Sequence, residues 1–289
     1  MTKPKSLKTR IFLDGGNPNE TREIIALLGF LDGQTTNPTL ISRHPEAKER
    51  LERGERFSEK EILEFYHQVV QDISRLIPDG SISIEVYADL LTTAEKMLRQ
   101  GKEMSSWIPN AHIKFPSARE GLKAAQQAVR EKMRVNLTLC FTQEQAAAVY
   151  AATRSAKRGD VFVSPFIGRL DDQGENGMDV ISNIIRMYEK GDGHVEVLTA
   201  SVRKVDHLLY ALKLGSDIIT APFGILKEWG KRGLPIPGED YAYDSGNLKP
   251  LPFREIDLTK RWVDYDIHHE LTDRGMEQFS MDWNALIRP

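Results

Sequence analysis

The sequence has almost no cysteine, because Cys140 is the one thiol in 289 residues. A lone thiol cannot close an intramolecular disulfide, which excludes a disulfide-stabilised secreted domain and favours a reducing compartment. Long hydrophobic runs are also missing, since no stretch reaches the roughly 18 apolar residues that span a bilayer. The basic start MTKPKSLKTR leads into IFLD rather than the apolar run of a signal peptide. We therefore predict a cytoplasmic protein with no membrane partner.

The sequence also lacks an excess of positive charge. The formal net charge is −3, so no global positive field attracts nucleic acid, and we predict no nucleic-acid partner. Hydrophobic residues make up 40% of the chain and charged residues 28%. These proportions are those of an ordinary globular enzyme and exclude a mostly disordered chain.

Motifs for metals and nucleotide cofactors are absent from the sequence. No two of the seven histidines have the spacing of metal ligands on one helical face, and the adjacent pair His268 and His269 would point apart. Gly15 and Gly16 lack the rest of a glycine-rich phosphate loop. We predict neither a metal nor a cofactor.

Short runs rich in β-branched residues are present, and each is followed by a sequence with helical character. This alternation is typical of parallel βα units. Eight such units close most naturally into a (β/α)8 barrel, whereas an open doubly wound sheet more often has about five or six strands. The predicted strands are residues 10–15, 32–37, 81–88, 111–116, 134–141, 161–167, 195–201 and 216–223.

The spacing of these units predicts one barrel domain over residues 1–289. Start and stop signals predict helices over 17–29 and 142–158, and the charge-dense connection 44–65 is interpreted as a solvated pair of helices. Residues 230–262, rich in Gly, Pro and aromatics, are interpreted as an insertion after the eighth strand that covers the barrel or an oligomer interface. A C-terminal tail with a short helix follows over 270–289.

Polar side chains occur at the carboxyl ends of the predicted strands, where barrels carry their active sites. His112 and Lys114 share one face of their strand because side chains alternate with period two. A helix-facing Lys114 would be buried among apolar groups without a partner, so the inward face is expected. The strand-end group is Asp14, Asn37, Glu85, Lys114, Asn136, Thr138, Ser164 and Ser201.

One amine and two carboxylates among amides and hydroxyls suit a polyol that carries a carbonyl. A desolvated lysine such as Lys114 can attack a ketone to form an iminium, which accepts electrons when the adjacent carbon–carbon bond breaks. Asp14 and Glu85 could share the proton transfers of cleavage and of Schiff-base formation. These residues predict a Schiff-base aldolase chemistry.

Two arginines follow the late strands, where many barrels bind phosphate. Arg169 and Arg203, with Ser201 beside the second, suggest an anionic substrate tail because guanidinium groups match phosphate oxygens. The alternative for Arg169 is a salt bridge with Asp171 or Asp172.

Five segments together resemble the transaldolase family over nearly the whole chain. They are IFLDGGN with DGQTTNPTLI, HIKFP, VNLTLCF, VSPFIGRLDD and TASVRK, and the tail LTDRGMEQFSMDW is similar to the family's closing helix. The resemblance implies a transferase of the pentose phosphate pathway that moves a dihydroxyacetone unit from a ketose phosphate to an aldose phosphate without cofactor or metal. Small-molecule sugar phosphates would be its partners, in a homo-oligomer.

The resemblance also implies a role for each matching residue. Lys114 would form the Schiff base, Asp14 would act as acid and base at the cleaved bond, and Glu85 with Thr138 would hold the catalytic water. The dihydroxyacetone ligands would be Asn37, Asn136 and Ser164, and the phosphate ligands would be Arg169, Ser201 and Arg203.

Two positions separate transaldolases from the related fructose-6-phosphate aldolases, which tend to have Gln in the third strand and Tyr after the Ser-Pro of the sixth. Glu85 and Phe166 stand there in this sequence, which favours transfer. The alternatives are a lyase that releases dihydroxyacetone, a transferase for another anionic sugar such as a sulfonate, and a catalytically silent barrel. His112 and the loop after Asp14, which reads Gly-Gly-Asn, depart from the family pattern.

Overall fold

The structure is a computed structural model that describes residues 2–288. Its centre is a closed barrel of eight parallel strands, in which neighbours follow chain order and the last strand pairs with the first. The predicted (β/α)8 barrel is confirmed, and each predicted segment contains one strand, although most strands are shorter than predicted. The strands are β1 (Arg10–Asp14), β2 (Gly33–Thr35), β3 (Ser81–Glu85), β4 (Ala111–Pro116), β5 (Val135–Cys140), β6 (Val161–Pro165), β7 (Val195–Thr199) and β8 (Ile218–Pro222).

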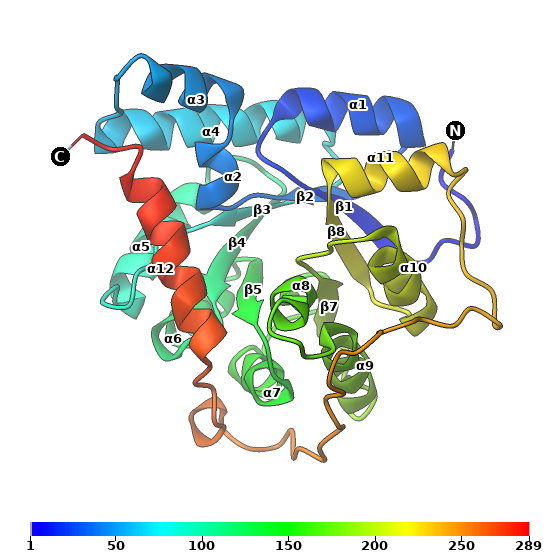
Figure 1. Cartoon of the computed structure of the whole chain (residues 1–289). Coiled ribbons are helices and arrows are strands. Elements are labelled where there is room, and N and C mark those ends of the chain that lie inside the picture. Colours follow the sequence, from blue (N-terminus) through cyan, green and yellow to red (C-terminus); the bar gives the residue numbers. More distant parts are fainter. Residues whose placement is uncertain (1, 289) are drawn as a thin grey trace.

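Helices surround the barrel and alternate with its strands (Figure 1). Helix α1 starts and ends where the sequence signals predict, because the Asn17 side chain caps its first turn and Gly29, at φ 79°, ends it in the left-handed region. The helices are α1 (Pro18–Leu28), α2 (Pro38–Ser42), α3 (Pro45–Glu52), α4 (Glu59–Leu76), α5 (Ala94–Ser105), α6 (Arg119–Arg130), α7 (Gln143–Ala152), α8 (Ile167–Asp171), α9 (Gly177–Tyr188), α10 (Val205–Leu214), α11 (Phe223–Lys231), the 3₁₀ turn η1 (Trp262–Asp264) and α12 (Glu270–Asn284).

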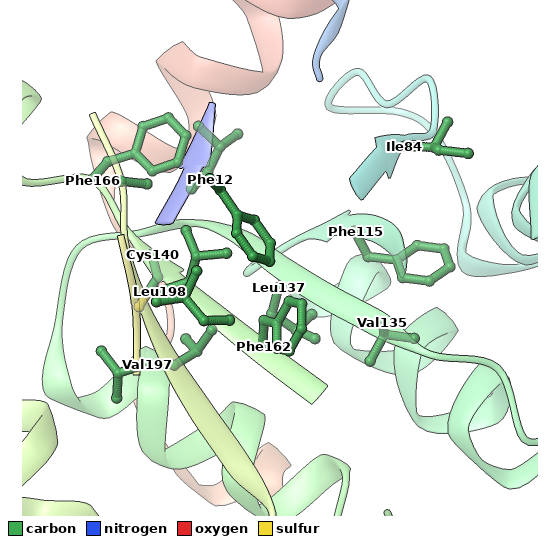
Figure 2. Close-up of a cluster of buried hydrophobic side chains, with 14 of the residues drawn as sticks. Phe12, Ile84, Phe115, Val135, Leu137, Cys140, Phe162, Phe166, Val197 and Leu198 are labelled. Carbon is green, nitrogen blue, oxygen red and sulfur yellow. The ribbon is translucent and has the colours of Figure 1, made fainter. Parts of the chain in front are cut away.

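Apolar side chains fill the middle of the barrel and form a floor below the strand ends. The rings of Phe12 and Phe162 meet edge to face with centroids 6.2 Å apart, and Figure 2 shows the Phe12 ring directed at Phe162. Gly33 makes room for this pair, because a Cβ there would lie 2.5 Å from the Phe12 ring. Side chains therefore fill the interior of the barrel, and a ligand can bind only at its ends.

The predicted insertion 230–262 starts at the end of helix α11 and is almost entirely irregular. Helix α11 comes directly after β8, and residues 232–261, all described by the structure, then run as an irregular strap along the outer helices (Figure 1, orange). The Tyr243 ring stacks on Tyr210 of α10, and Lys249 bonds through its backbone N–H to the Gly174 carbonyl. The strap therefore packs against α10 and the connection between α8 and α9, on the outside of the barrel.

The last helix returns to the barrel. Helix α12 passes over the carboxyl ends of the strands, next to α2 and β5 (Figure 1, red). The Thr272 hydroxyl donates to the Leu139 carbonyl in β5, and Thr39 of α2 donates to Asp282. This helix therefore forms one wall above the strand ends. Across residues 2–288, none of the helices combines the length and the hydropathy needed to cross a membrane.

Candidate active site

A buried lysine and carboxylate occupy neighbouring strands at the carboxyl end of the barrel. Lys114 of β4 lies in register with Glu85 of β3, and its Nζ is 2.6 Å from Glu85 Oε2. The two side chains are 4% and 5% exposed. Lys114 Nζ also donates to the Thr36 carbonyl at 2.9 Å. A buried charge without a partner would be costly, so this pair accounts for the presence of Lys114 inside the barrel.

A second carboxylate lies at the end of β1. Asp14 Oδ1 accepts a hydrogen bond of 2.8 Å from the Thr35 hydroxyl, which is also 2.7 Å from the Thr220 hydroxyl. Burial raises the pKa of Asp14, and the charge of Lys114 and the bond from Thr35 oppose that rise. Asp14 therefore holds a proton at a higher pH than a carboxyl group in water.

Glu85 is shifted in the same direction. Burial raises its pKa, while the positive charge of Lys114 and the hydrogen bond between them lower it. A carboxyl group that binds and releases a proton nearer neutrality is suited to acid–base catalysis. The site thus holds one amine between two carboxyl groups of elevated pKa.

Amide and hydroxyl groups of β3, β5 and β6 form a hydrogen-bonded row. Ser164 Oγ donates to Asn136 Oδ1 at 2.6 Å, and Asn136 Nδ2 donates to Ser83 Oγ at 3.0 Å. Thr138 follows Asn136 on the same face of β5, and its buried Oγ1 has no hydrogen-bond partner within residues 2–288. The strand is irregular just beyond, where Leu139 has a φ of 55° and the pairing with β6 shifts.

The two predicted arginines lie on neighbouring connections of the barrel, Arg169 in helix α8 after β6 and Arg203 in the loop after β7. Arg203 forms an ion pair with Asp172 at 3.0 Å, and both side chains are exposed. The guanidinium of Arg169 lies between the rings of Phe166 and Phe279, 5.6 Å and 5.4 Å from their centroids. The alternative salt bridge of Arg169 with Asp171 or Asp172 is not formed, because those carboxylates contact other groups.

One cavity of about 400 Å³ joins most of these side chains. Glu85 and Asn136 lie beneath its wall, in contact with Lys114 and Ser164. The other nine predicted site residues line it directly: Asp14, Asn37, Lys114, Thr138, Ser164, Phe166, Arg169, Ser201 and Arg203.

The structure adds residues that the sequence did not indicate. Thr220 of β8, Arg43 at the end of α2 and three residues of α12 (Gln278, Phe279 and Asp282) also line the cavity. Thr220 follows the same strand-end rule as the predicted residues and could have been found by it. The α12 residues carry no such signal, since their position depends on how the tail crosses the barrel.

Tyr66 of α4 was also missed. Its buried hydroxyl is 2.5 Å from Thr36 Oγ1 and accepts a hydrogen bond from the Glu85 backbone N–H at 3.1 Å. Because Thr36 Oγ1 itself donates to the Ser83 carbonyl, the Tyr66 hydroxyl must donate to Thr36. Tyr66 thereby links the ends of β2 and β3 beside the lysine, although its sequence context is only the apolar face of a helix.

His112 faces into the barrel as its spacing from Lys114 predicts, but it lies at the opposite end. Its ring stacks on Phe162 at 4.0 Å, and its nitrogens contact the Ser81 hydroxyl and the Gly159 carbonyl at 2.7 Å and 2.9 Å. Burial lowers the pKa of His112 to about 3, so the ring is neutral. The histidine has a structural position and does not contact Lys114.

Gly168 allows helix α8 and the loop that carries Arg203 to approach each other. A Cβ on Gly168 would lie 2.3 Å from the Ser201 carbonyl oxygen and 2.4 Å from Arg203 Nε. Ser201 has little freedom to move away, because it already adopts a left-handed φ of 60°. The close contact therefore requires a residue without a side chain.

We expect Gly168→Ala to lower the free energy of unfolding by about 1–3 kcal/mol, because the added methyl group overpacks this contact. Gly224→Ala is the matched control, since a Cβ there meets no atom within 4 Å and alanine favours a helix. Chemical denaturation of both variants measures the difference. Equal stabilities would show that the loops separate without cost.

Fold and site together define the class of the protein: a (β/α)8 barrel with a polar cavity at the carboxyl ends of its strands, built around a buried lysine–carboxylate pair. Residues 11–288 match the family model described as Transaldolase/Fructose-6-phosphate aldolase. The chain belongs to this family, as its sequence motifs predict.

Curated relatives agree with the family over their full length. A probable transaldolase of Thermoanaerobacter sp. is 35% identical, covering 95% of this chain and 96% of the relative. A probable transaldolase of Roseiflexus sp. is 34% identical over 96% and 97% of the two chains, and one of Dehalococcoides mccartyi is 31% identical over 96% and 99%. Among solved structures, a 3-hexulose-6-phosphate synthase shares 16% identity with a TM-score of 0.48, covering 78% of this chain and 98% of that chain.

Proposed function

We propose that the protein is a transaldolase, which transfers a dihydroxyacetone unit from a ketose phosphate to an aldose phosphate through a Schiff base on Lys114. The observation that carries this proposal is the pairing of the buried Lys114 with Glu85 at 2.6 Å, in a cavity that Asp14 also lines. A lysine amine must lose its proton before it can attack a carbonyl, and the adjacent carboxylate is placed to take that proton.

The chemistry can be followed through these groups. The Lys114 amine adds to the ketone carbon, and loss of water gives an iminium. Asp14 then removes the proton of the hydroxyl beside the bond to be broken, the bond electrons move into the iminium as an enamine, and the aldose phosphate leaves. The enamine attacks the carbonyl carbon of the acceptor aldehyde, Asp14 returns the proton to the new hydroxyl, and water releases the product from the lysine.

The hydroxyl groups of the dihydroxyacetone unit would bind the polar wall of the cavity. Ser164 and Asn136 are held by each other and by Ser83, so their positions are set before a ligand binds. Asn37 uses its amide oxygen to cap α2 through the Leu40 N–H, which leaves its amide N–H groups for a ligand. Thr138 Oγ1, which lacks a protein partner within residues 2–288, would hold a reacting water with Glu85.

The phosphate would bind between Arg169, Arg203 and Ser201. Two guanidinium groups attract the dianion, and the exposed ion pair between Arg203 and Asp172 is weak enough to be exchanged for it. A sulfonate, which is also an anionic tail, would meet the same groups with one charge less. We propose phosphorylated sugars because two arginines match a dianion better than a monoanion.

Transfer is proposed over free aldol cleavage on two residues. Glu85 supplies a carboxylate beside Lys114, and Phe166 places an apolar ring in the cavity wall where a tyrosine would add a hydroxyl. Because position 166 carries no phenol, the cavity wall there offers no hydroxyl that could protonate the enamine, and the enamine persists until the acceptor arrives.

Trapping with borohydride tests the proposal. The protein is incubated with fructose 6-phosphate, with and without erythrose 4-phosphate, and mass spectrometry follows the protein and the products. A three-carbon adduct on Lys114, with sedoheptulose 7-phosphate formed only when the acceptor is present, is expected. Free dihydroxyacetone without acceptor would indicate a lyase, and the absence of any adduct from this and from sulfonated sugars would indicate a silent barrel.

We expect Arg203→Ala to raise the KM for fructose 6-phosphate by about 10- to 100-fold, the effect of losing one charge-assisted hydrogen bond. The KM for an unphosphorylated dihydroxyacetone donor should stay near its original value. Asp172→Asn is the control, because it releases Arg203 from its ion pair and should leave the KM for fructose 6-phosphate equal or lower. Steady-state kinetics with both donors measure these values, and equal losses on both would contradict the phosphate assignment.

A further inference from the structure

A buried histidine outside the cavity joins helix α8, which carries Arg169, to the loop that carries Arg203. His207 of α10 is 1% exposed, and its Nδ1 accepts a hydrogen bond of 3.3 Å from the backbone N–H of Arg203. Its Nε2 lies 3.0 Å from Oδ2 of Asp171, the last residue of α8, close enough for charge attraction but without the alignment of a hydrogen bond. Because α8 also carries Arg169, the histidine connects the elements that bear both guanidinium groups.

The contacts determine where the proton of the ring lies. A nitrogen that accepts a hydrogen bond carries no proton, so in a neutral ring the proton is on Nε2, which faces the Asp171 carboxylate. Asp171 is itself fixed, since its Oδ1 accepts the Gly177 backbone N–H at 2.9 Å. The negative charge of the carboxylate therefore favours the tautomer of His207 with its proton on Nε2, which is the tautomer that can accept from Arg203.

The strap, residues 232–261, covers the contacts of His207 with Asp171 and Arg203 from the outside of the barrel. The Tyr243 ring stacks on Tyr210 at 4.6 Å with an interplanar angle of 4°, and its centroid lies 6.0 Å from that of His207. Tyr241 donates from its hydroxyl to the Asp206 carbonyl, next to the histidine. The strap thus limits access of water to the contact between His207 and Asp171, which strengthens that contact.

We propose that His207 is a positioning residue for the anion-binding loop, and that Asp171 acts by fixing its tautomer. Within residues 2–288, the His207 ring forms a hydrogen bond with one cavity-lining residue, through the Arg203 backbone, so it acts by holding Arg203 where an anion can bind it. The inference rests on the proposed phosphate site, which it extends to the support behind that site.

Two substitutions of His207 test the roles of its two ring nitrogens one at a time. His207→Asn places an amide oxygen near the position of Nδ1 and can still accept from Arg203, whereas His207→Gln places its amide near Nε2 and cannot. In Asp171→Asn, one orientation of the new amide points its N–H group at His207 Nε2, so the ring proton must move to Nδ1. The other orientation points the N–H group at the Gly177 backbone N–H, which is also a donor. Both orientations therefore weaken the hold of His207 on the Arg203 backbone.

The probe is inorganic phosphate, with its Kd measured by calorimetry, alongside the KM for fructose 6-phosphate. We expect His207→Gln and Asp171→Asn to raise both constants about tenfold, the loss of roughly one hydrogen bond. His207→Asn should stay within about threefold of the original protein, and kcat on an unphosphorylated donor should be unchanged in all three. Tyr243→Phe is the control, because the Tyr243 hydroxyl has no hydrogen-bond partner within residues 2–288.

Equal weakening by His207→Asn and His207→Gln, or no weakening by Gln, overturns the inference. If His207→Gln does not fold, Asp171→Asn decides in the same way. The trapping experiment tests the proposed function, and the phosphate Kd tests the positioning role. If no adduct is trapped but the phosphate Kd rises in His207→Gln, the proposed function fails and the positioning role is still supported. A trapped adduct with a phosphate Kd that is the same in all variants rejects the positioning role alone.

Discussion

Lys114→Met is expected to abolish both the borohydride-trapped adduct and turnover, with kcat reduced by at least the order of 10⁴-fold that follows loss of a covalent nucleophile. Methionine has a similar length but no amine, so no iminium can form at this position. Lys123→Met is the matched control, because that lysine is exposed on α6 and does not line the cavity. Mass spectrometry and kinetics of both variants give the comparison, and an adduct or turnover retained by Lys114→Met would reject the mechanism.

The same substitution has a consequence for stability. Without Lys114, Glu85 is left as a buried carboxyl group whose counter-charge is gone, and breaking such a pair costs about 3–5 kcal/mol. Adding Glu85→Gln removes the unpaired charge, so the double variant should recover part of the lost free energy of unfolding. Denaturation of the single and double variants measures this recovery. A double variant no more stable than Lys114→Met would show that the pair is not electrostatically coupled.

The order of strands and most of the cavity could be predicted from local sequence. A run such as SISIE is short, β-branched and bounded by turn residues, so it identifies β3 without knowledge of its partners. Once eight such runs imply a barrel, the rule that ligands bind at the carboxyl ends selects Lys114 and Asp14 directly. Period-two alternation then accounts for the inward position of Thr138.

Contacts between distant segments were not predictable in this way. The alternative for Arg169, a salt bridge with Asp171 or Asp172, was based on their closeness in the chain. In the structure Asp172 contacts Arg203 and Asp171 contacts His207, since α8 packs across the next loop. Closeness in the sequence favours the prediction of salt bridges between neighbouring residues. In the fold, the connection after one strand directs its side chains toward the connection after the next strand.

The path of the strap could not be predicted for a related reason. Its Gly, Pro and aromatic content indicated ordered structure but not the surface on which it lies. That surface is set by individual contacts with α9, α10 and α7, such as Asn183 Nδ2 donating to the Leu251 carbonyl and Gln143 Nε2 donating to the Arg254 carbonyl. Irregular segments satisfy their backbone groups with whatever side chains are near, and no periodic pattern records that choice.

Asp14→Asn is expected to lower kcat for transfer by about 10²- to 10⁴-fold, the usual contribution of a general base. The asparagine keeps the size of the side chain and can still accept from the Thr35 hydroxyl, so the fold should be retained. It cannot accept the proton of the substrate hydroxyl, and cleavage of the carbon–carbon bond should therefore fail after the iminium has formed. Asp14→Asn should therefore allow iminium formation on Lys114 but block cleavage of the carbon–carbon bond.

The mass of the trapped adduct distinguishes these steps. With fructose 6-phosphate and borohydride, the original protein should carry a three-carbon adduct on Lys114, whereas Asp14→Asn should carry the whole ketose phosphate. Thr35→Val is the control, because it removes the hydrogen bond to Asp14 but leaves the carboxylate, and its adduct should remain the three-carbon one. A three-carbon adduct at an undiminished rate in Asp14→Asn would assign the cleavage proton to another group, and Glu85 is the remaining carboxylate beside the lysine.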